Sequence, residues 1–221
     1  MSRIRVVLLD VDGTLIDSND AHAQAWVEVG REFGFDIDFA HVRRLIGMGG
    51  DKVLPALTGL REDDPPGERI LERRGEIFRT TRLPTLKPFP CARELLERLR
   101  ADGYTLAVAT SASSEDVDGL LEQAGIRDLI EEQASSGDAD ESKPDPDIVQ
   151  AALREAGARP EEAVMLGDTP YDVEASGRAG VRCVALRCGG WDDGDLRGAV
   201  AVYDDPADLL ARYAESPFAA K

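Results

Sequence analysis

The chain has 221 residues, of which 43% are hydrophobic and 31% are charged, which suffices for one substantial core plus a smaller inserted module. Its 43 acidic residues outnumber its 26 Lys and Arg residues, and the net charge of −17 makes DNA and RNA poor candidate partners. No apolar run approaches the ~20 residues of a membrane span, so we expect no membrane partner and a cytoplasmic location.

Apolar runs alternate with amphipathic stretches along most of the chain. The first run, residues 4–9, is continuous and rich in β-branched residues, which is typical of a strand buried on both faces. Similar runs cover 105–110, 163–166, 181–186 and 199–202, and helix-like stretches cover 92–101, 114–124, 147–156 and 206–214. This order predicts an α/β fold with a doubly wound, Rossmann-like parallel sheet.

The pattern changes between Asp17 and Leu83, where helical spacing replaces the apolar runs. The clearest stripe consists of Ala21, Ala25, Val29 and Phe33. A polar segment at 17–19, suited to a helix cap or hinge, and the proline-bearing stretch 83–90 mark the ends. We therefore predict an α-helical cap domain at 18–83, inserted into a catalytic core formed by 1–17 and 84–221.

Polar residues stand just beyond three of the predicted strands. They are Asp10 and Asp12, Thr110 and Ser111, and Asp168 with Asp172, while Lys143 precedes a helix. Taken singly, each has an ordinary structural explanation, such as a turn at Asp12-Gly13. Ligands of an open parallel sheet bind at the carboxyl ends of its strands, however, so these residues are expected to meet at one edge.

Carboxylates gathered at that edge would repel one another unless a cation lay between them. Magnesium fits best, because a few carboxylates hold it while waters and a substrate phosphate complete its octahedron. Thr110 and Lys143 could then bind the non-bridging oxygens of a phosphoryl group. The expected partner is a small phosphorylated metabolite.

In these motifs the chain resembles the haloacid dehalogenase superfamily, in its phosphatase branch with a helical cap. The matching positions are the Asp-Val-Asp-Gly-Thr-Leu run at 10–15, Thr110, Lys143 in Ser-Lys-Pro, and the Gly-Asp-Thr-Pro-Tyr-Asp run at 167–172. Cys91 departs from the pattern, because similar sequences usually carry glycine there.

The resemblance implies a role for each of these residues. Asp10 would be the nucleophile that forms an aspartyl-phosphate, and Asp12 the general acid and then base. The magnesium ligands would be the Asp10 carboxylate, the Asp12 backbone carbonyl and Asp168, with Asp172 nearby as a water-mediated ligand. Lys143 would neutralise charge on both Asp10 and the phosphate.

Several activities share this set of motifs. We expect a phosphatase of the phosphoglycolate phosphatase type, and a sugar-phosphate mutase like β-phosphoglucomutase is the main alternative. Asp12 argues against a haloacid dehalogenase and a phosphonoacetaldehyde hydrolase, which lack an acid there. The latter uses a cap lysine, for which Lys52 is the candidate. A non-enzymatic receiver domain is disfavoured by the order of the motifs.

The segment Gly47-Met48-Gly49-Gly50 is too flexible for a helix interior and is predicted to form a loop that closes over the site. Lys52 or Arg44 is expected to reach the substrate there, which would suit a carboxylated ester such as phosphoglycolate. A monomer or a homodimer is expected.

Overall fold

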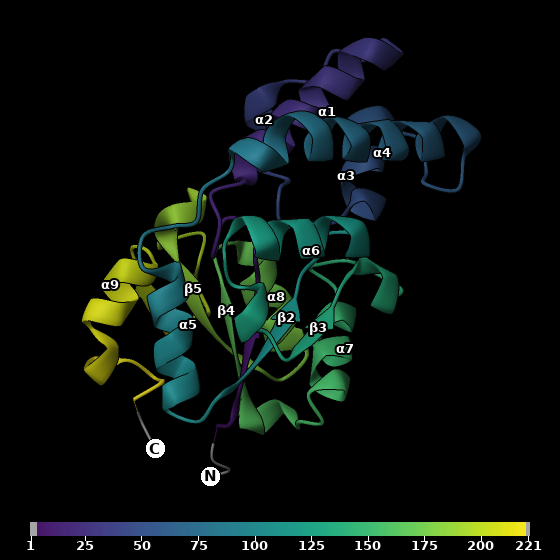
Figure 1. The fold of residues 1–221 in the computed structure, drawn as a ribbon. Helices are drawn as coiled ribbons and strands as arrows, with labels where there is room; N and C mark the ends of the chain where they lie inside the picture. The colour runs from purple at the N-terminus through teal and green to yellow at the C-terminus, as the bar shows by residue number, and fades with distance from the viewer. Residues whose placement is uncertain (1–3, 220–221) are drawn as a thin grey trace.

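A computed structural model describes residues 4–219, which form an α/β core beneath a helical cap (Figure 1). The core holds a sheet of six parallel strands in the order β3-β2-β1-β4-β5-β6. The strands are β1 (Val6–Leu9), β2 (Thr105–Ala109), β3 (Glu132–Ala134), β4 (Ala163–Gly167), β5 (Arg182–Leu186) and β6 (Ala201–Tyr203). The predicted doubly wound sheet is confirmed.

Helices cover both faces of the sheet, which explains why its central strands are continuously apolar. Val7 and Leu9 of β1 point into one hydrophobic cluster, and Val6 and Leu8 point into the other. Helices α5 (Ala92–Ala101), α6 (Ser114–Gln123) and α9 (Pro206–Ala211) pack in the first cluster. Helices α7 (Asp147–Glu155) and α8 (Pro170–Arg178) pack in the second.

Strand β3 was not predicted, and the expectation of five strands was wrong on this point. Its sequence is Glu-Gln-Ala, and it lies at the edge of the sheet, where it pairs with β2 from Ala107↔Glu132 to Ala109↔Ala134. An edge strand of three residues is held by backbone hydrogen bonds and needs no apolar run. The other strands begin and end within two residues of their predicted bounds, whereas α9 ends at Ala211, three residues before 214.

The cap consists of helices without a strand among the described residues. They are α1 (Asn19–Phe33), α2 (Phe39–Arg43), α3 (Gly50–Thr58) and α4 (Pro65–Ile77), followed by a π-helical turn, η1 (Phe78–Arg82), and a 3-10 turn at Leu83–Thr85. Helix α1 buries Trp26 and Val29, but Phe33 is 37% exposed, so the predicted apolar stripe is wrong at its last position. The division of the chain at 18 and 83 stays a prediction.

The two chain segments that join cap and core run side by side, since the Asp17 backbone N–H donates to the carbonyl of Lys87 at 3.0 Å. Short 3-10 turns lie in the core at Arg127–Leu129, Ser136–Asp138, Pro160–Glu162, Arg187–Gly189 and Tyr213–Glu215. Over residues 4–219, no helix combines the length and the apolar character needed to cross a membrane.

Candidate active site

The predicted site residues converge at the carboxyl edge of the sheet. Asp10 follows β1 and Asp168 follows β4, and these strands are neighbours, so the Asp10 backbone N–H donates to the Leu166 carbonyl at 2.9 Å. The chain reverses its direction of strand addition between these two strands, which is where open α/β sheets bind ligands. Thr110 and Ser111, after β2, line the adjacent pocket.

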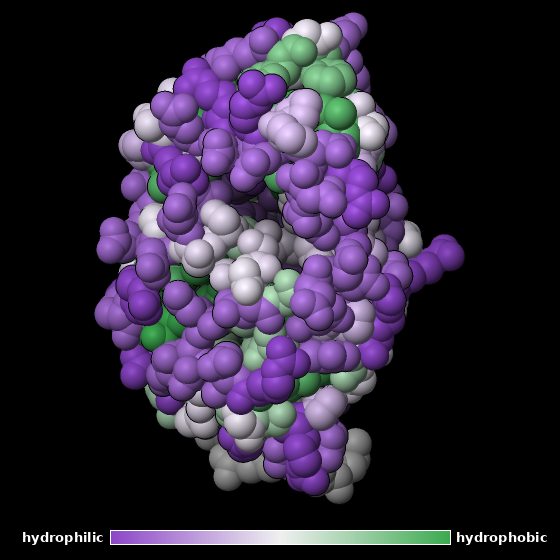
Figure 2. Space-filling view, turned by 90° about the vertical axis from the view of Figure 1, so that its right-hand side faces the viewer, coloured by the Kyte–Doolittle hydropathy of each residue, from purple (hydrophilic) through white to green (hydrophobic). Residues whose placement is uncertain are grey.

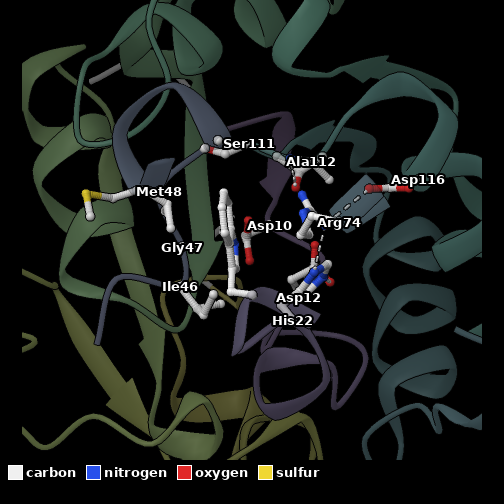
Figure 3. Close-up of a pocket in the computed structure, with 15 residues that line it drawn as sticks. Asp10, Asp12, His22, Ile46, Gly47, Met48, Arg74, Ser111, Ala112 and Asp116 are labelled. Atoms are coloured by element: carbon white, nitrogen blue, oxygen red, sulfur yellow. Dashed lines mark hydrogen bonds and ion pairs between the residues drawn. The ribbon is translucent and has the colours of Figure 1, made fainter. Parts of the chain in front are cut away.

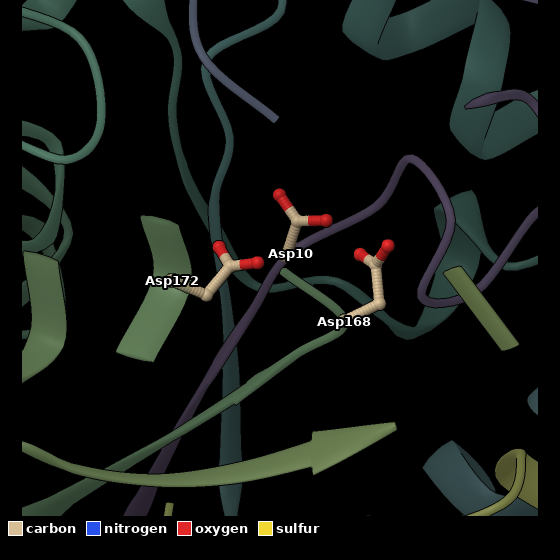
Figure 4. A group of neighbouring side chains, drawn as sticks. All are labelled: Asp10, Asp168 and Asp172. Carbon is tan, nitrogen blue, oxygen red and sulfur yellow. The ribbon is translucent and has the colours of Figure 1, made fainter. Parts of the chain in front are cut away.

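Three buried carboxylates gather at this point (Figure 4). Asp10, Asp168 and Asp172 can each offer an oxygen within 4.8 Å of the others. The Lys143 ammonium lies 2.6 Å from Asp10 Oδ1 and 2.7 Å from Asp172 Oδ1, and its side chain is 1% exposed. Lys143 therefore contacts the nucleophile candidate directly.

The electrostatics of the cluster favour a further cation. Burial raises the pKa of Asp10 to about 7 despite the attraction of Lys143. Burial, together with repulsion from Asp10 and Asp172, raises the pKa of Asp168 well above its ordinary value. Three carboxylates and one ammonium leave two negative charges when all are ionised, and the donors are all oxygens. These residues can thus hold a hard divalent metal ion.

Neighbouring side chains fix the orientation of these carboxylates. The Thr14 hydroxyl lies 2.8 Å from Asp168 Oδ1 and 3.1 Å from Asp10 Oδ2 and can donate its hydrogen to either, and the Asn19 amide donates to Asp168 Oδ2 at 3.0 Å. Gly13, with φ of 77°, passes so close that a Cβ there would lie 2.4 Å from the Asp168 carboxylate. The loop after β1 is therefore built to approach Asp168 closely.

Asp12 faces a different environment from Asp10. Its carboxylate accepts hydrogen bonds from the Ser18 hydroxyl and from His22 Nε2, the latter at 2.8 Å. Burial alone would raise the pKa of Asp12, but the interactions with His22, Ser18 and Arg74 outweigh it and lower the pKa. Its carboxylate is not part of the metal-binding group among the described residues, so the two aspartates are separated by their contacts.

The cap closes over these groups and forms a pocket with them (Figure 3). From the cap it is lined by His22, Trp26, Ile46, Gly47, Met48, Gly49, Gly50, Val53 and Arg74, and from the core by Asp10, Asp12, Thr110, Ser111, Ala112 and Asp116. Gly47, Met48 and Gly49 form a glycine loop that lines the pocket, Gly50 is the first residue of α3, and the closing of this loop over the site stays a prediction. Gly47, with φ of 112°, packs against Thr169, where a Cβ would lie 2.8 Å from the methyl group.

Among the polar residues of this site that were not predicted are Ser18, Asn19, His22, Arg74 and Asp116. The sequence predicts a helix cap or hinge at 17–19, and His22 lies one turn after Ser18 on the same helix face. Ser113 is the N-cap of α6 and Asp116 follows it by three residues, so in the sequence Asp116 resembles the acidic residue of an ordinary helix-capping pair. Arg74 lies between the buried residues Ile70 and Ile77 at helical spacing. A charged residue on the buried face of a helix is the sequence feature that could have identified it as a site residue.

Arg44 does not line the pocket, and its predicted contact with the substrate is not supported. Its guanidinium carbon lies 3.8 Å from the centroid of the Trp191 ring, and Nη2 lies 3.3 Å from Asp195 Oδ2. Its backbone carbonyl accepts a hydrogen bond from the Tyr171 hydroxyl at 2.6 Å. Arg44 therefore joins the cap to the core outside the pocket.

Lys52 is likewise engaged elsewhere. Its ammonium lies 2.8 Å from Glu141 Oε2 and 2.8 Å from Asp145 Oδ2, both on the core. Near it, the Gly49 backbone N–H donates to the Ser142 hydroxyl at 2.9 Å. Together with the Arg44 contacts, this second group fastens the cap on either side of the glycine loop.

The chain is similar to proteins of known class. Residues 7–186 match the profile of the haloacid dehalogenase-like hydrolases. A phosphoglycolate phosphatase of Aquifex aeolicus is 34% identical over 81% of this chain and 83% of its own length. A hydrolase from Pseudomonas syringae has the same fold with a TM-score of 0.88 and 31% identity, covering 96% of this chain and 98% of that one.

A putative β-phosphoglucomutase from Bacteroides vulgatus also superposes, with a TM-score of 0.85 over 96% of this chain and 88% of that one, but at 24% identity it shows the fold alone. The family profile spans most of the chain and includes Asp10, Asp12, Thr110, Lys143 and Asp168. The chain belongs to the haloacid dehalogenase-like hydrolases, on the branch that its phosphatase relatives occupy.

Proposed function

We propose that this hydrolase is a magnesium-dependent phosphatase of small phosphate monoesters, similar in activity to phosphoglycolate phosphatases. The observation that carries the proposal is the separate placement of two aspartates. Asp10 lies against Lys143 in the carboxylate cluster, whereas Asp12 is held by His22 and faces the cap. One is thereby suited to attack phosphorus and the other to transfer a proton.

In the first step, an Asp10 oxygen forms a bond to phosphorus while the bond from phosphorus to the ester oxygen breaks. Asp12 donates its proton to the departing alkoxide. Lys143, which contacts Asp10, stabilises negative charge on the transferred group. Thr110 and Ser111, which line the pocket, would donate hydrogen bonds to phosphoryl oxygens.

In the second step, Asp12 takes a proton from a water molecule as that water attacks the phosphorus of the aspartyl-phosphate. The bond from phosphorus to Asp10 breaks, and inorganic phosphate leaves. When bound, Mg²⁺ would offset the negative charges of substrate and cluster, held by Asp10, Asp168 and the Asp12 backbone carbonyl, with Asp172 close by.

A sugar-phosphate mutase is the second candidate. The cap residues cover Asp10 and Asp12, and exclusion of water would favour transfer from Asp10 to a sugar. A phosphonoacetaldehyde hydrolase is disfavoured, because Lys52 is paired with Glu141 and Asp145 outside the pocket. The presence of Asp12 disfavours a dehalogenase, since a halide leaves without a proton.

The test is a panel of phosphate monoesters that includes phosphoglycolate and both hexose phosphates, assayed with and without Mg²⁺. We expect phosphate release that requires the metal and is lost in Asp10→Asn. Formation of glucose 6-phosphate from β-glucose 1-phosphate and its bisphosphate activator would instead identify a mutase.

We retain the small phosphorylated metabolite as partner, the cytoplasmic location and a monomer or homodimer as predictions.

A further inference from the structure

The pocket contains a positively charged side chain, that of Arg74, which has no role in the proposed reaction. Arg74, on α4, lies beside Asp12 and His22 in the pocket (Figure 3). Its side chain is 15% exposed, so the guanidinium is largely withdrawn from water. If Asp12 protonates the leaving group, as proposed above, that group would lie close to Arg74 as well.

The hydrogen-bonding capacity of Arg74 is poorly used by the protein. Its Nε is buried without a partner, and Nη1 makes a 3.4 Å contact with His22 Nδ1 and lies 3.7 Å from Asp116 Oδ2. Lys143, by contrast, makes ion pairs of 2.6 and 2.7 Å. Because a buried donor without an acceptor destabilises the protein, a ligand oxygen at Arg74 would be favoured.

The charges around Arg74 favour an acceptor with a single negative charge. Asp116 is shared with Arg79, whose Nη1 is closer, at 3.0 Å from Oδ1. One buried carboxylate thus faces two guanidinium groups, and Arg79 also pairs with the exposed Glu115 at 3.2 Å. A planar carboxylate matches the parallel N–H donors of the Arg74 guanidinium. A second phosphate group carries two negative charges and would be repelled by the nearby Asp116 carboxylate.

The surroundings of the pocket agree with a small organic acid. Its remaining cap wall is apolar near Trp26, Ile46, Met48 and Val53, which suits a short carbon chain. The wider cavity next to it, seen as a hollow between cap and core in Figure 2, is lined by Arg74 and Arg79 and by the acidic residues Asp51, Glu62, Glu72, Glu115, Asp116 and Asp140. A long, highly anionic leaving group would be repelled there.

We propose that Arg74 binds a carboxylate of the leaving group and that the substrates are phosphate esters of small hydroxy acids. This inference rests on the proposed phosphatase function and assigns to Arg74 the contact expected of Arg44 or Lys52. Arg74 would act as a specificity-determining residue and take no part in bond making.

Two esters of nearly equal size test the proposal: phosphoglycolate, which carries a carboxylate, and 2-hydroxyethyl phosphate, which does not. For the unmodified enzyme we expect kcat/KM for phosphoglycolate to be greater by about tenfold or more, the effect of a hydrogen bond to a charged group. In Arg74→Gln the ratio should fall to near one. The matched control is Arg79→Gln, in the same charge network, which should keep the preference.

The outcomes distinguish a failure of the phosphatase function from a failure of the role of Arg74. If the unmodified enzyme releases phosphate from no ester of the panel, the proposed function is wrong and this inference with it. If it hydrolyses both test esters with equal kcat/KM, or if Arg74→Gln keeps the preference, the enzyme is a phosphatase but the role of Arg74 is wrong. Preference for glucose 1,6-bisphosphate over phosphoglycolate would mark a second phosphate site and likewise overturn the proposal.

Should Arg74→Gln fail to fold, as judged by circular dichroism, Arg74→Lys supplies the test. Lysine keeps the charge but lacks the planar fork, so the preference for phosphoglycolate should decrease, because the bidentate contact is lost. A preference in Arg74→Lys as large as in the unmodified enzyme would contradict bidentate binding of a carboxylate.

Discussion

Asp10 and Asp12 stand two positions apart in the sequence, yet their side chains meet opposite surroundings. The cluster around Asp10 contains Lys143 and two further carboxylates, whereas Asp12 accepts hydrogen bonds from Ser18 and His22. Their pKa values move apart as a result, upward for Asp10 and downward for Asp12. Bound Mg²⁺ would lower the pKa of Asp10 and so keep the nucleophile ionised, whereas Asp12 must take up a proton before it can protonate the leaving group.

The role of Asp12 predicts a dependence on the leaving group. In Asp12→Asn, an alkyl ester should lose roughly 10²–10⁴-fold in rate, because its alkoxide needs the proton. p-Nitrophenyl phosphate has a leaving group that needs none, so it should still phosphorylate Asp10 and give a burst of nitrophenolate equal to the enzyme concentration. Rapid-quench kinetics measures this burst, and equal losses for both esters without a burst would contradict the assignment.

Cys91 adopts a backbone conformation that favours glycine. Among the described residues it is the one non-glycine with a positive φ, 59°, just before α5. A side chain in this left-handed conformation is strained by about 1–2 kcal/mol. Cys91→Gly should therefore raise the free energy of unfolding by about 1 kcal/mol in urea denaturation, and Cys91→Ala, the control, should not. A destabilised glycine variant would contradict this explanation.

At the scale of elements, the cap is fastened by two groups of contacts on either side of the glycine loop. Arg44 meets Trp191 and Asp195, and Lys52 meets Glu141 and Asp145. Ion pairs of this exposure contribute up to about 1 kcal/mol each. They can bias the equilibrium between open and closed caps without determining the fold.

Removing the positive charges of Arg44 and Lys52 should therefore increase the fraction of molecules with an open cap. In the double variant Arg44→Met, Lys52→Met, we expect roughly tenfold faster hydrogen exchange in residues 47–50 and a higher KM. Added salt should likewise increase hydrogen exchange and KM in the unmodified protein, because salt screens these ion pairs. Lys87→Met, at an exposed lysine, is the control. Unchanged exchange in the double variant would show that other contacts hold the cap.

At the scale of the whole molecule, the sequence predicted the sheet and its reactive edge because both depend on local patterns. Apolar runs indicate buried strands, and the residues that follow them necessarily lie at the carboxyl edge. Contacts between distant segments leave no such pattern. Arg74 reaches His22 from another helix, and Lys52 is paired with residues about 90 positions away, so neither partner could be inferred from spacing.

The charge of the cluster predicts how metal and pH act together on stability. The pKa of Asp10 is raised in the folded protein, so the stability that its protonated form provides is lost as pH rises through about 7. Mg²⁺ binds the ionised carboxylates. The melting temperature should therefore increase more on addition of Mg²⁺ at about pH 8 than at about pH 5, as measured by calorimetry. An equal or larger increase at the lower pH would contradict the metal site.

The central claim is that Asp10 carries the phosphoryl group during turnover. The most direct measurement reacts the Asp12→Asn enzyme with p-nitrophenyl phosphate and Mg²⁺, quenches it with borohydride, and analyses its peptides by mass spectrometry. Borohydride reduces an acyl phosphate to an alcohol, so residue 10 should appear as homoserine, in amounts that follow the burst. A burst that leaves residue 10 as unreduced aspartate, or metal-dependent turnover by Asp10→Asn, would contradict the mechanism.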